Sequence, residues 1–482
     1  MVSLDLPSVP ASFGPGPRSP ELAGARIKAD VARVVAFSMQ SRAEGDFLWG
    51  RVTGRPGYDR TVAWAAEQMR AAGLKDAHLE PFVAPTFSLP LASEVRLVAS
   101  DAFGAGSRDI AFQSVMVGGK GPVNGSATAA LVYVGQGTDA DLAGRDLRGK
   151  IAVINGTPNP GVYSTNEASR LKVVVAAGAV AAIEILEQPG NMKSFDGDRH
   201  GCGTALCFTL GGEDGFFLMN VLGAAAKGGQ TVTARVAAKS ETLTDAKVAN
   251  AVATLPGRTD RVVIVNAHAD AWFVGADDNA SGLATFLALA RYFAKQPKLE
   301  RTLVFVVSAG HHTAANGLAA FRAAHDGDVV SRTDLVVNLE HVASSGLSRS
   351  AVERQDNNFG FKTLATTAEF PKQVGVSNRA PFLVDLWRQG VTCFGLSVQR
   401  VVDAQNPGEL LRFVDRPTPT TQMISAGPLY HTSGETVDSI PDAGLERAAR
   451  FHAFLITEAA NAPVALLNGG PSASRPGCPR TP

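Results

Sequence analysis

Three short apolar runs, rich in β-branched residues, recur in the second half of the chain at Val262–Val265, Thr302–Val307 and Leu335–Leu339. A run without polar alternation is expected of a strand that is buried on both faces of a sheet. An Ala- and Leu-rich helix is predicted between the first two runs, at Ser281–Ala294. Strands that alternate with helices indicate a mostly parallel sheet with helices on both faces, so the chain is predicted to be an α/β protein.

The composition and the hydrophobic pattern of the sequence change along the rest of the chain and indicate how it divides into domains. Helices are predicted at 24–42 and 57–73, and strands at His78–Val83, Glu94–Val98, Ala249–Thr254 and Thr392–Ser397. Between about Ser114 and Lys239, Ala-, Val- and Ile-rich runs with Gly-containing turns predict a smaller β-rich inserted domain. The predicted organisation has four parts: an extended or disordered arm at 1–22, an α/β domain at 23–113 and 240–465, an insertion at 114–239, and a flexible tail at 466–482.

Charge and length exclude some classes of function. The 482 residues include 45 Lys plus Arg and 45 Asp plus Glu, so the net charge is zero and nothing favours nucleic acid as a partner. No stretch approaches the roughly 20 apolar residues of a membrane span. The N-terminus lacks the pattern of a signal peptide, so the protein is either cytoplasmic or secreted with its signal removed.

The four cysteines carry little information. They form no CxxC pair, so neither a disulfide scaffold nor a structural zinc site is expected. Only Cys202 and Cys207 are close in sequence, and one bridge between them stays open for a secreted form.

Metal-binding residue types follow the predicted strands. His268 and Asp270 come after the first run, His311 and His312 after the second, and Glu340 and His341 after the third. Ligands in such sheets sit at the carboxyl ends of the strands, and imidazoles together with carboxylates are the ingredients of a metal site. A single histidine after a strand is more often a loop residue, so it is the ordered recurrence that predicts a site. His341 is expected to point to the opposite side of its strand from Glu340, and therefore not to be a ligand.

The order of these motifs resembles the zinc aminopeptidase and carboxypeptidase Q-like metallopeptidases (metallopeptidase family twenty-eight). The matching motifs are His268-Ala269-Asp270, Gly275-Ala276-Asp277-Asp278-Asn279-Ala280-Ser281-Gly282, Asn338-Leu339-Glu340 and Tyr430-His431-Thr432-Ser433-Gly434. The similarity runs from about Arg51 to Ala459. The segments Leu131–Gly135 and Asp146–Val153 look like the protease-associated domain that is often inserted in this family.

The resemblance implies a ligand set and a mechanism. His268 and Glu340 would hold one zinc, and Asp277 would bridge it to a second zinc held by His312 and His431. Asp270 would orient His268, and Tyr430 would stabilise the oxyanion. Two zinc ions would activate water and the scissile carbonyl of a peptide or a peptide-like small molecule.

The chain also departs from the family. His311-His312 stands where the family carries Glu-Glu, whose first member is the general base and whose second is a ligand, and Glu340 replaces the usual Asp. An imidazole at position 312 can still bind zinc, while His311, with an ordinary pKa near 6.5, becomes the candidate general base. The predicted function is therefore a metal-dependent amide hydrolase with catalytic residues His311, Asp270 and Tyr430.

Two alternatives stay open. A His-rich site with one ion of iron, manganese or another divalent metal would suit lyase, isomerase or oxidative chemistry. The second alternative is a binding protein without catalytic activity. The metal-binding side chains that are kept at the ligand positions argue against it. The sequence leaves open whether the chain forms homo-oligomers.

Overall fold

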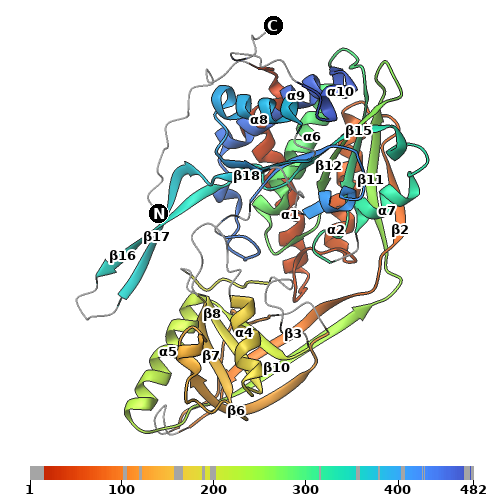
Figure 1. Cartoon of the computed structure of the whole chain (residues 1–482). Helices are drawn as coiled ribbons and strands as arrows, with labels where there is room; N and C mark the ends of the chain where they lie inside the picture. Colours follow the sequence, from red (N-terminus) through yellow and green to blue (C-terminus); the bar gives the residue numbers. More distant parts are fainter. Residues whose placement is uncertain are drawn as a thin grey trace.

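The computed structural model describes residues 16–100, 106–118, 122–156, 167–186, 190–195, 202, 204–313, 316–353, 359–377, 380–402, 408–425, 427, 429–471 and 478. They form two lobes, with the longer strands of the smaller lobe reaching up to the larger one (Figure 1). The helices are α1 (Gly24–Ala43), α2 (Pro56–Ala71), α3 (Asp139–Leu142), α4 (Glu167–Ala176), α5 (Gly212–Lys227), α6 (Gly282–Phe293), α7 (Gly317–Ala324), α8 (Pro381–Phe394), α9 (Asp442–Asn461) and α10 (Val464–Leu467). The strands are β1 (Gly50–Arg51), β2 (His78–Val83), β3 (Phe87–Leu97), β4 (Ile110–Ala111), β5 (Met116–Val117), β6 (Gly125–Tyr133), β7 (Ile151–Gly156), β8 (Ala181–Leu186), β9 (Leu206–Leu210), β10 (Thr233–Leu243), β11 (Lys247–Leu255), β12 (Val262–His268), β13 (Ala271–Trp272), β14 (Thr302–Ser308), β15 (Thr333–Leu339), β16 (Ser345–Glu353), β17 (Phe359–Glu369), β18 (Lys372–Val376), β19 (Val398–Val402) and β20 (Thr420–Ile424).

An eight-stranded sheet organises the larger lobe, in the order β19-β18-β20-β15-β12-β14-β11-β2. Its central strands β20, β15, β12 and β14 are parallel. Antiparallel pairs flank them, β18 with β20 on one side and β11 with β14 on the other. The predicted α/β class is confirmed, while "mostly parallel" describes only the centre of this mixed sheet.

Both faces of the central strands are covered, as their continuous apolar sequences predict. Val263 and Val265 of β12 pack into the core formed with α1, α6 and α9. Val262 and Ile264 of the same strand face the opposite side, where Phe321 of α7 closes a second core. Because the period of a strand is two residues, one apolar run supplies both cores.

A second eight-stranded sheet, in the order β4-β3-β10-β6-β7-β8-β9-β5, forms the smaller lobe. The two long strands β3 and β10 pair along most of their length and run up towards the larger lobe (Figure 1). The lobe starts earlier than residue 114, because β3 and β4 belong to its sheet. It also carries the helices α4 and α5, which pack on β8.

Two local expectations fail. Residues 392–397 do not form a strand, because α8 continues to Phe394 and buries Leu383, Leu386, Trp387 and Gly390 at helical spacing. The expectation for the cysteines is also incomplete: the Cys202–Cys207 bridge that stayed open is formed, and Cys393 bonds to Cys478 across 85 residues, a bridge that was not expected. The second bridge fastens the C-terminal segment to α8, and sequence spacing cannot reveal such a contact.

Much of the predicted arm and tail lies outside the described residues, namely 1–15, 472–477 and 479–482. Within the described part, Pro20–Leu22 form a short 3-10 helix with Leu22 buried. Among the described helices, none is long and apolar enough to cross a membrane.

Candidate metal centre

Five histidines converge at one edge of the central sheet, and four of them face a single buried carboxylate, that of Asp278. His268 ends β12, His311 and His312 follow β14, His341 follows β15, and His431 lies in the turn after β20. The Asp278 Oδ1 atom lies 3.2 Å from His268 Nε2 and 3.1 Å from His341 Nε2. The Oδ2 atom lies 3.2 Å from His312 Nε2 and 3.0 Å from His431 Nε2.

Asp277, which the sequence analysis placed at the centre of the site, points elsewhere. Its Oδ2 atom lies 3.5 Å from the ammonium group of Lys372, a buried residue that also donates to Ser344 at 2.8 Å. The two adjacent aspartates project in different directions, and the prediction chose the one that faces away from the histidines. The structure therefore replaces Asp277 by Asp278 as the carboxylate among the histidines.

His341 also contradicts its expectation. The alternation rule would turn it away from Glu340, but β15 ends at Leu339 and His341 has a left-handed backbone with φ of 51°. This conformation turns the ring into the cluster, with 2% of the residue exposed. The rule fails here because it holds only while the chain stays extended.

Glu340 contributes the second carboxylate of the centre. Its Oε1 atom lies 3.9 Å from His268 Nε2 and 3.4 Å from His311 Nε2. Its Oε2 atom accepts a hydrogen bond from Asn338 Nδ2 at 2.8 Å. Asn338 is itself held by amide contacts to Asn266 on β12 and Gln422 on β20, so an amide ladder across three strand ends fixes Glu340.

Asp270 supports the histidines from behind. One carboxylate oxygen accepts the backbone N–H of His311 at 3.1 Å, and the other accepts that of His312 at 3.0 Å. The Nδ1 atom of His268 lies 3.2 Å from the Asp270 carbonyl oxygen and 3.5 Å from its Oδ1 atom. Asp270 thus positions three of the imidazoles.

His311 is held by a carboxylate of its own. Its Nδ1 atom lies 3.1 Å from Oε1 of Glu409, a residue that is 2% exposed, and Ser308 donates to the other Glu409 oxygen at 3.1 Å. A carboxylate only accepts, so Nδ1 carries the hydrogen and Nε2 faces the centre with its lone pair. The ring also stacks on His268, with centroids 4.1 Å apart.

Charge is strongly coupled across the centre. Burial lowers the pKa of His312 to about 3, against the attraction of Asp278. Burial acts in the same direction on His268, but the neighbouring carboxylates of Asp270 and Asp278 hold its pKa well above the usual value. Burial opposes ionisation of Asp278 too, yet the surrounding imidazoles hold its pKa well below the usual range. Asp278 is therefore held in its ionised form inside the protein, and its negative charge favours a cation among the histidines.

The donor atoms fit zinc ions. In tetrahedral zinc sites with bonds of about 2.0–2.1 Å, neighbouring ligand atoms lie about 3.3 Å apart. The distances from the Asp278 oxygens to the four nearest imidazole nitrogens are 3.0–3.2 Å. The buried Nε2 atoms of His268, His312 and His341 make no well-formed hydrogen bond, as expected of atoms that bind a metal ion. His268, Asp278 and Glu340 would hold one ion, and His312, Asp278 and His431 a second.

The smaller lobe completes one wall of the centre. Its segment 192–195, here called the strap, runs antiparallel to the turn that carries His431: Phe195 N–H donates to the His431 carbonyl at 3.1 Å and Ser433 N–H to the Lys193 carbonyl at 2.9 Å. The Phe195 ring packs edge-on against Trp272, which in turn lies 5.3 Å from the His312 ring. Contacts from the second lobe therefore fix two ligand candidates.

Tyr430 precedes His431 in this turn. Its ring stacks on His431 with centroids 3.5 Å apart and lies 5.3 Å from His341. The structure thus brings it to the centre together with the predicted residues His268, Asp270, His311, His312, Glu340 and His431.

Several residues of the centre were missed by sequence reasoning. Arg51 is fully buried and donates to the carbonyls of Ala269, Val274 and Gly275, which hold the loop between His268 and Asp278. Glu435 accepts the backbone N–H of Asp278 at 2.9 Å. Arg51 and Glu409 come from distant segments and lack a local motif, so only the fold reveals their contacts. Glu435 follows the Tyr430–Gly434 motif directly and was expected to bond within its own turn, but its carboxylate reaches the backbone of Asp278 instead.

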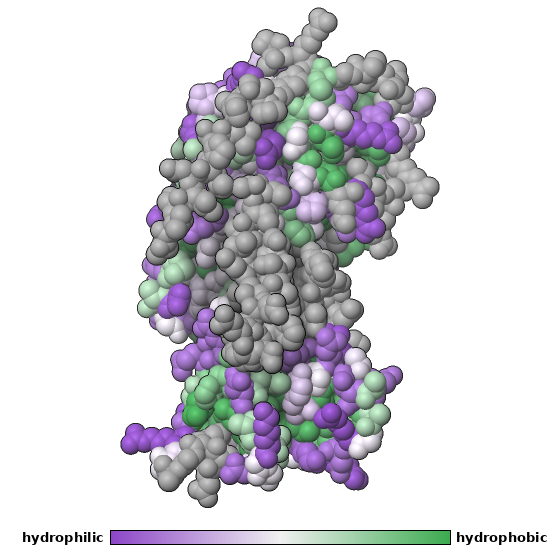
Figure 2. All heavy atoms as spheres, turned by 90° about the vertical axis from the view of Figure 1, so that its left-hand side faces the viewer, coloured by the Kyte–Doolittle hydropathy of each residue, from purple (hydrophilic) through white to green (hydrophobic). Residues whose placement is uncertain are grey.

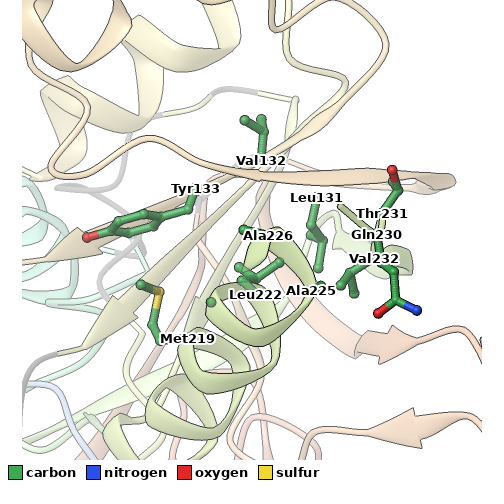
Figure 3. A pocket seen from close by; sticks show the side chains of 11 residues that line it. Leu131, Val132, Tyr133, Met219, Leu222, Ala225, Ala226, Gln230, Thr231 and Val232 are labelled. Atoms are coloured by element: carbon green, nitrogen blue, oxygen red, sulfur yellow. The ribbon is translucent and has the colours of Figure 1, made fainter. Parts of the chain in front are cut away.

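A separate hollow lies in the smaller lobe between β6 and α5 (Figure 3). It has a volume of about 390 Å³, and Leu131, Tyr133, Met219 and Leu222 are among its lining residues. Apolar surface is visible on this lobe in Figure 2, and Phe216 and Phe217 of α5 are exposed. The lining has no carboxylate or imidazole, so the hollow lacks the chemistry of the histidine centre.

Comparisons with known proteins agree with the fold. The structure is similar to a peptidase M28 precursor from Shewanella amazonensis (TM-score 0.65, 16% identity, covering 91% of this chain and 95% of that one). It is also similar to a zinc aminopeptidase from Bacillus subtilis (0.62, 18%, 92% and 96%) and an aminopeptidase from Aneurinibacillus (0.54, 21%, 96% and 100%). No curated protein matches the sequence. The model of peptidase family M28 matches residues 250–456, which contain all five converging histidines, and this part of the chain belongs to that family.

Proposed function

We propose that this protein is a metal-dependent hydrolase that cleaves an amide bond in a peptide or a peptide-like small molecule. The observation that carries the proposal is the pair of donor sets around Asp278, with three buried imidazole Nε2 atoms that have no well-formed hydrogen bond. Membership of a peptidase family supports the same reaction class.

Two zinc ions, held by His268, Asp278 and Glu340 and by His312, Asp278 and His431, would supply Lewis acidity to water and to the scissile carbonyl. His311 would be the general base, because its Nε2 faces the centre while Glu409 holds Nδ1. It would take the proton of the attacking water as the new C–O bond forms. The proton would then pass to the amine that leaves when the C–N bond breaks.

The other predicted roles are narrower. Tyr430 would donate its hydroxyl hydrogen to the developing oxyanion from its place beside His431. Asp270 would act as a positioning residue, since it holds the backbone N–H groups of both His311 and His312. The identity of the smaller lobe as a protease-associated domain stays a prediction from the sequence.

The proposal is tested with free and N-blocked peptides and aminoacyl anilides, before and after removal of metal by a chelator. Hydrolysis that disappears with the chelator and returns with zinc would support it, and comparison of free with blocked substrates would distinguish aminopeptidase from other action. Hydrolysis that survives complete removal of metal would contradict it.

One geometric observation favours a second candidate. Ligand atoms of His268, His311 and Glu340 all lie within 4.8 Å of one another. Two imidazoles and one carboxylate are the donor set of single-iron oxidative sites. In that case His311 would be a ligand and not a base, and the chain would bind one iron or manganese ion rather than two zinc ions.

A further inference from the structure

We propose that His341 is an additional metal ligand, at the position that also uses His268 and Glu340. The inference rests on the proposed metal-dependent function, and it adds a ligand that the motif resemblance does not supply. With His341 as a ligand, two imidazoles would accompany each oxygen of Asp278 at the two metal positions.

The hydrogen bond on the far side of the ring fixes which nitrogen of neutral His341 is available. Nδ1 lies 3.1 Å from the backbone carbonyl of Ser425, which can only accept. Nδ1 therefore carries the hydrogen, and the Nε2 lone pair points into the centre. Metal-bound histidines almost always show this arrangement, with the second nitrogen donating to a carbonyl or a carboxylate.

The atoms that face Nε2 are also acceptors. Asp278 Oδ1 lies 3.1 Å away and Glu340 Oε1 3.9 Å away, and Nε2 is buried without a well-formed hydrogen bond. A lone pair facing a carboxylate in a buried site costs free energy unless a cation lies between them. That cation is a metal ion or a proton on His341 itself, and these are the two outcomes that an experiment must separate.

The backbone supports a role beyond packing. His341 has φ of 51°, a left-handed conformation that is uncommon for residues other than glycine. Such conformations cost about 1–3 kcal/mol and cluster at functional sites, where the surroundings hold them in place. Here the conformation is what turns the ring from the other side of β15 into the centre.

The symmetry of the donors predicts metal preference. His268 and His341 face Asp278 Oδ1, and His312 and His431 face Oδ2. Two imidazoles for each ion favour zinc, nickel or copper over the hard ions magnesium and calcium, which prefer oxygen ligands. The extra neutral ligand adds no charge, so it strengthens the site without further repulsion between carboxylates.

The test uses the full chain with His341→Asn, stripped of metal and titrated with zinc by calorimetry. Asn tolerates the left-handed backbone and its amide can still donate to Ser425, but no donor atom reaches the position of Nε2. We expect one of two zinc-binding events to weaken by at least about 10- to 100-fold, the range that loss of an outer-shell partner alone costs. His325→Asn, at a histidine that pairs with Glu80 away from the centre, is the matched control and should bind zinc as the wild type does.

A second readout is the visible absorption of the cobalt-loaded protein. Loss of an imidazole should change the intensity and position of the cobalt bands in His341→Asn and not in the control. Equal zinc affinity and identical cobalt spectra in wild type and variant would overturn the inference, leave the proposed function standing, and assign His341 as a protonated partner of Asp278. A wild-type chain that binds neither ion would overturn the proposed function itself.

Discussion

Glu409 offers a sharp test of His311 as a general base. The carboxylate accepts from His311 Nδ1 at 3.1 Å and is buried, so it sets both the tautomer and the direction of Nε2. A hydrogen bond to a charged group contributes about 1.5–3 kcal/mol and a neutral one about 0.5–1.5 kcal/mol. Glu409→Gln should then cost about 1–1.5 kcal/mol and Glu409→Ala about 1.5–3 kcal/mol. Since about 1.4 kcal/mol corresponds to a tenfold change in rate, kcat should fall about tenfold in the first variant and about 10- to 150-fold in the second.

The assay is steady-state hydrolysis of the best substrate, with zinc content measured on the same samples. We expect kcat to fall in the order wild type, Gln, Ala, with KM and zinc content little changed. A kcat within twofold of wild type in both variants would refute the role of the Glu409–His311 pair in the reaction. A parallel loss of zinc would instead identify His311 as a ligand.

Two further predictions concern stability. Phe195→Ala removes a buried ring packed on Trp272 and should cost about 3–5 kcal/mol, seen as a lower melting temperature; an unchanged value would show that the strap is not anchored there. Asp334 is buried and bonds to Arg261 and Arg301; burial alone would raise its pKa, but these bonds hold it below the usual value. A lowered folded pKa stabilises the fold above the unfolded pKa of about 3.9, and this contribution is lost as pH falls through the folded value. Asp334→Asn should therefore be less stable than the wild type at pH 7 by about 3–5 kcal/mol, seen as a lower melting temperature. The difference in stability between the two proteins should become smaller below about pH 4. A difference that does not depend on pH would contradict the reasoning.

The sequence predicted the architecture where periodicity and burial agree. The apolar runs at Val262–Val265, Thr302–Val307 and Leu335–Leu339 lie in the strands β12, β14 and β15, because a strand buried on both faces has no polar alternation. The segment 392–397 was also predicted as a strand, but its first three residues are the end of the helix α8, since short apolar runs do not separate the two states.

The candidate centre was predictable at the level of strand ends, and less so at the level of single side chains. Parallel strands bring their carboxyl ends to one edge, which is why His268, His312 and Glu340 meet. The choice between Asp277 and Asp278 depends on a loop conformation that no periodicity encodes. The sequence did not predict the place of His341 because its backbone leaves the extended region. Glu409 was not predicted because it lies about 100 residues after β14 in the chain.

The most direct test of the central claim is the metal content of the purified full chain, measured by elemental mass spectrometry together with Asp278→Asn and Asp277→Asn. We predict close to two zinc ions per chain in the wild type, near-complete loss in Asp278→Asn, and retention in Asp277→Asn, whose carboxylate faces Lys372 and not the histidines. One equivalent of iron or manganese would favour the non-hydrolytic alternative. A wild-type chain that holds no transition metal even after loading with zinc would contradict the account.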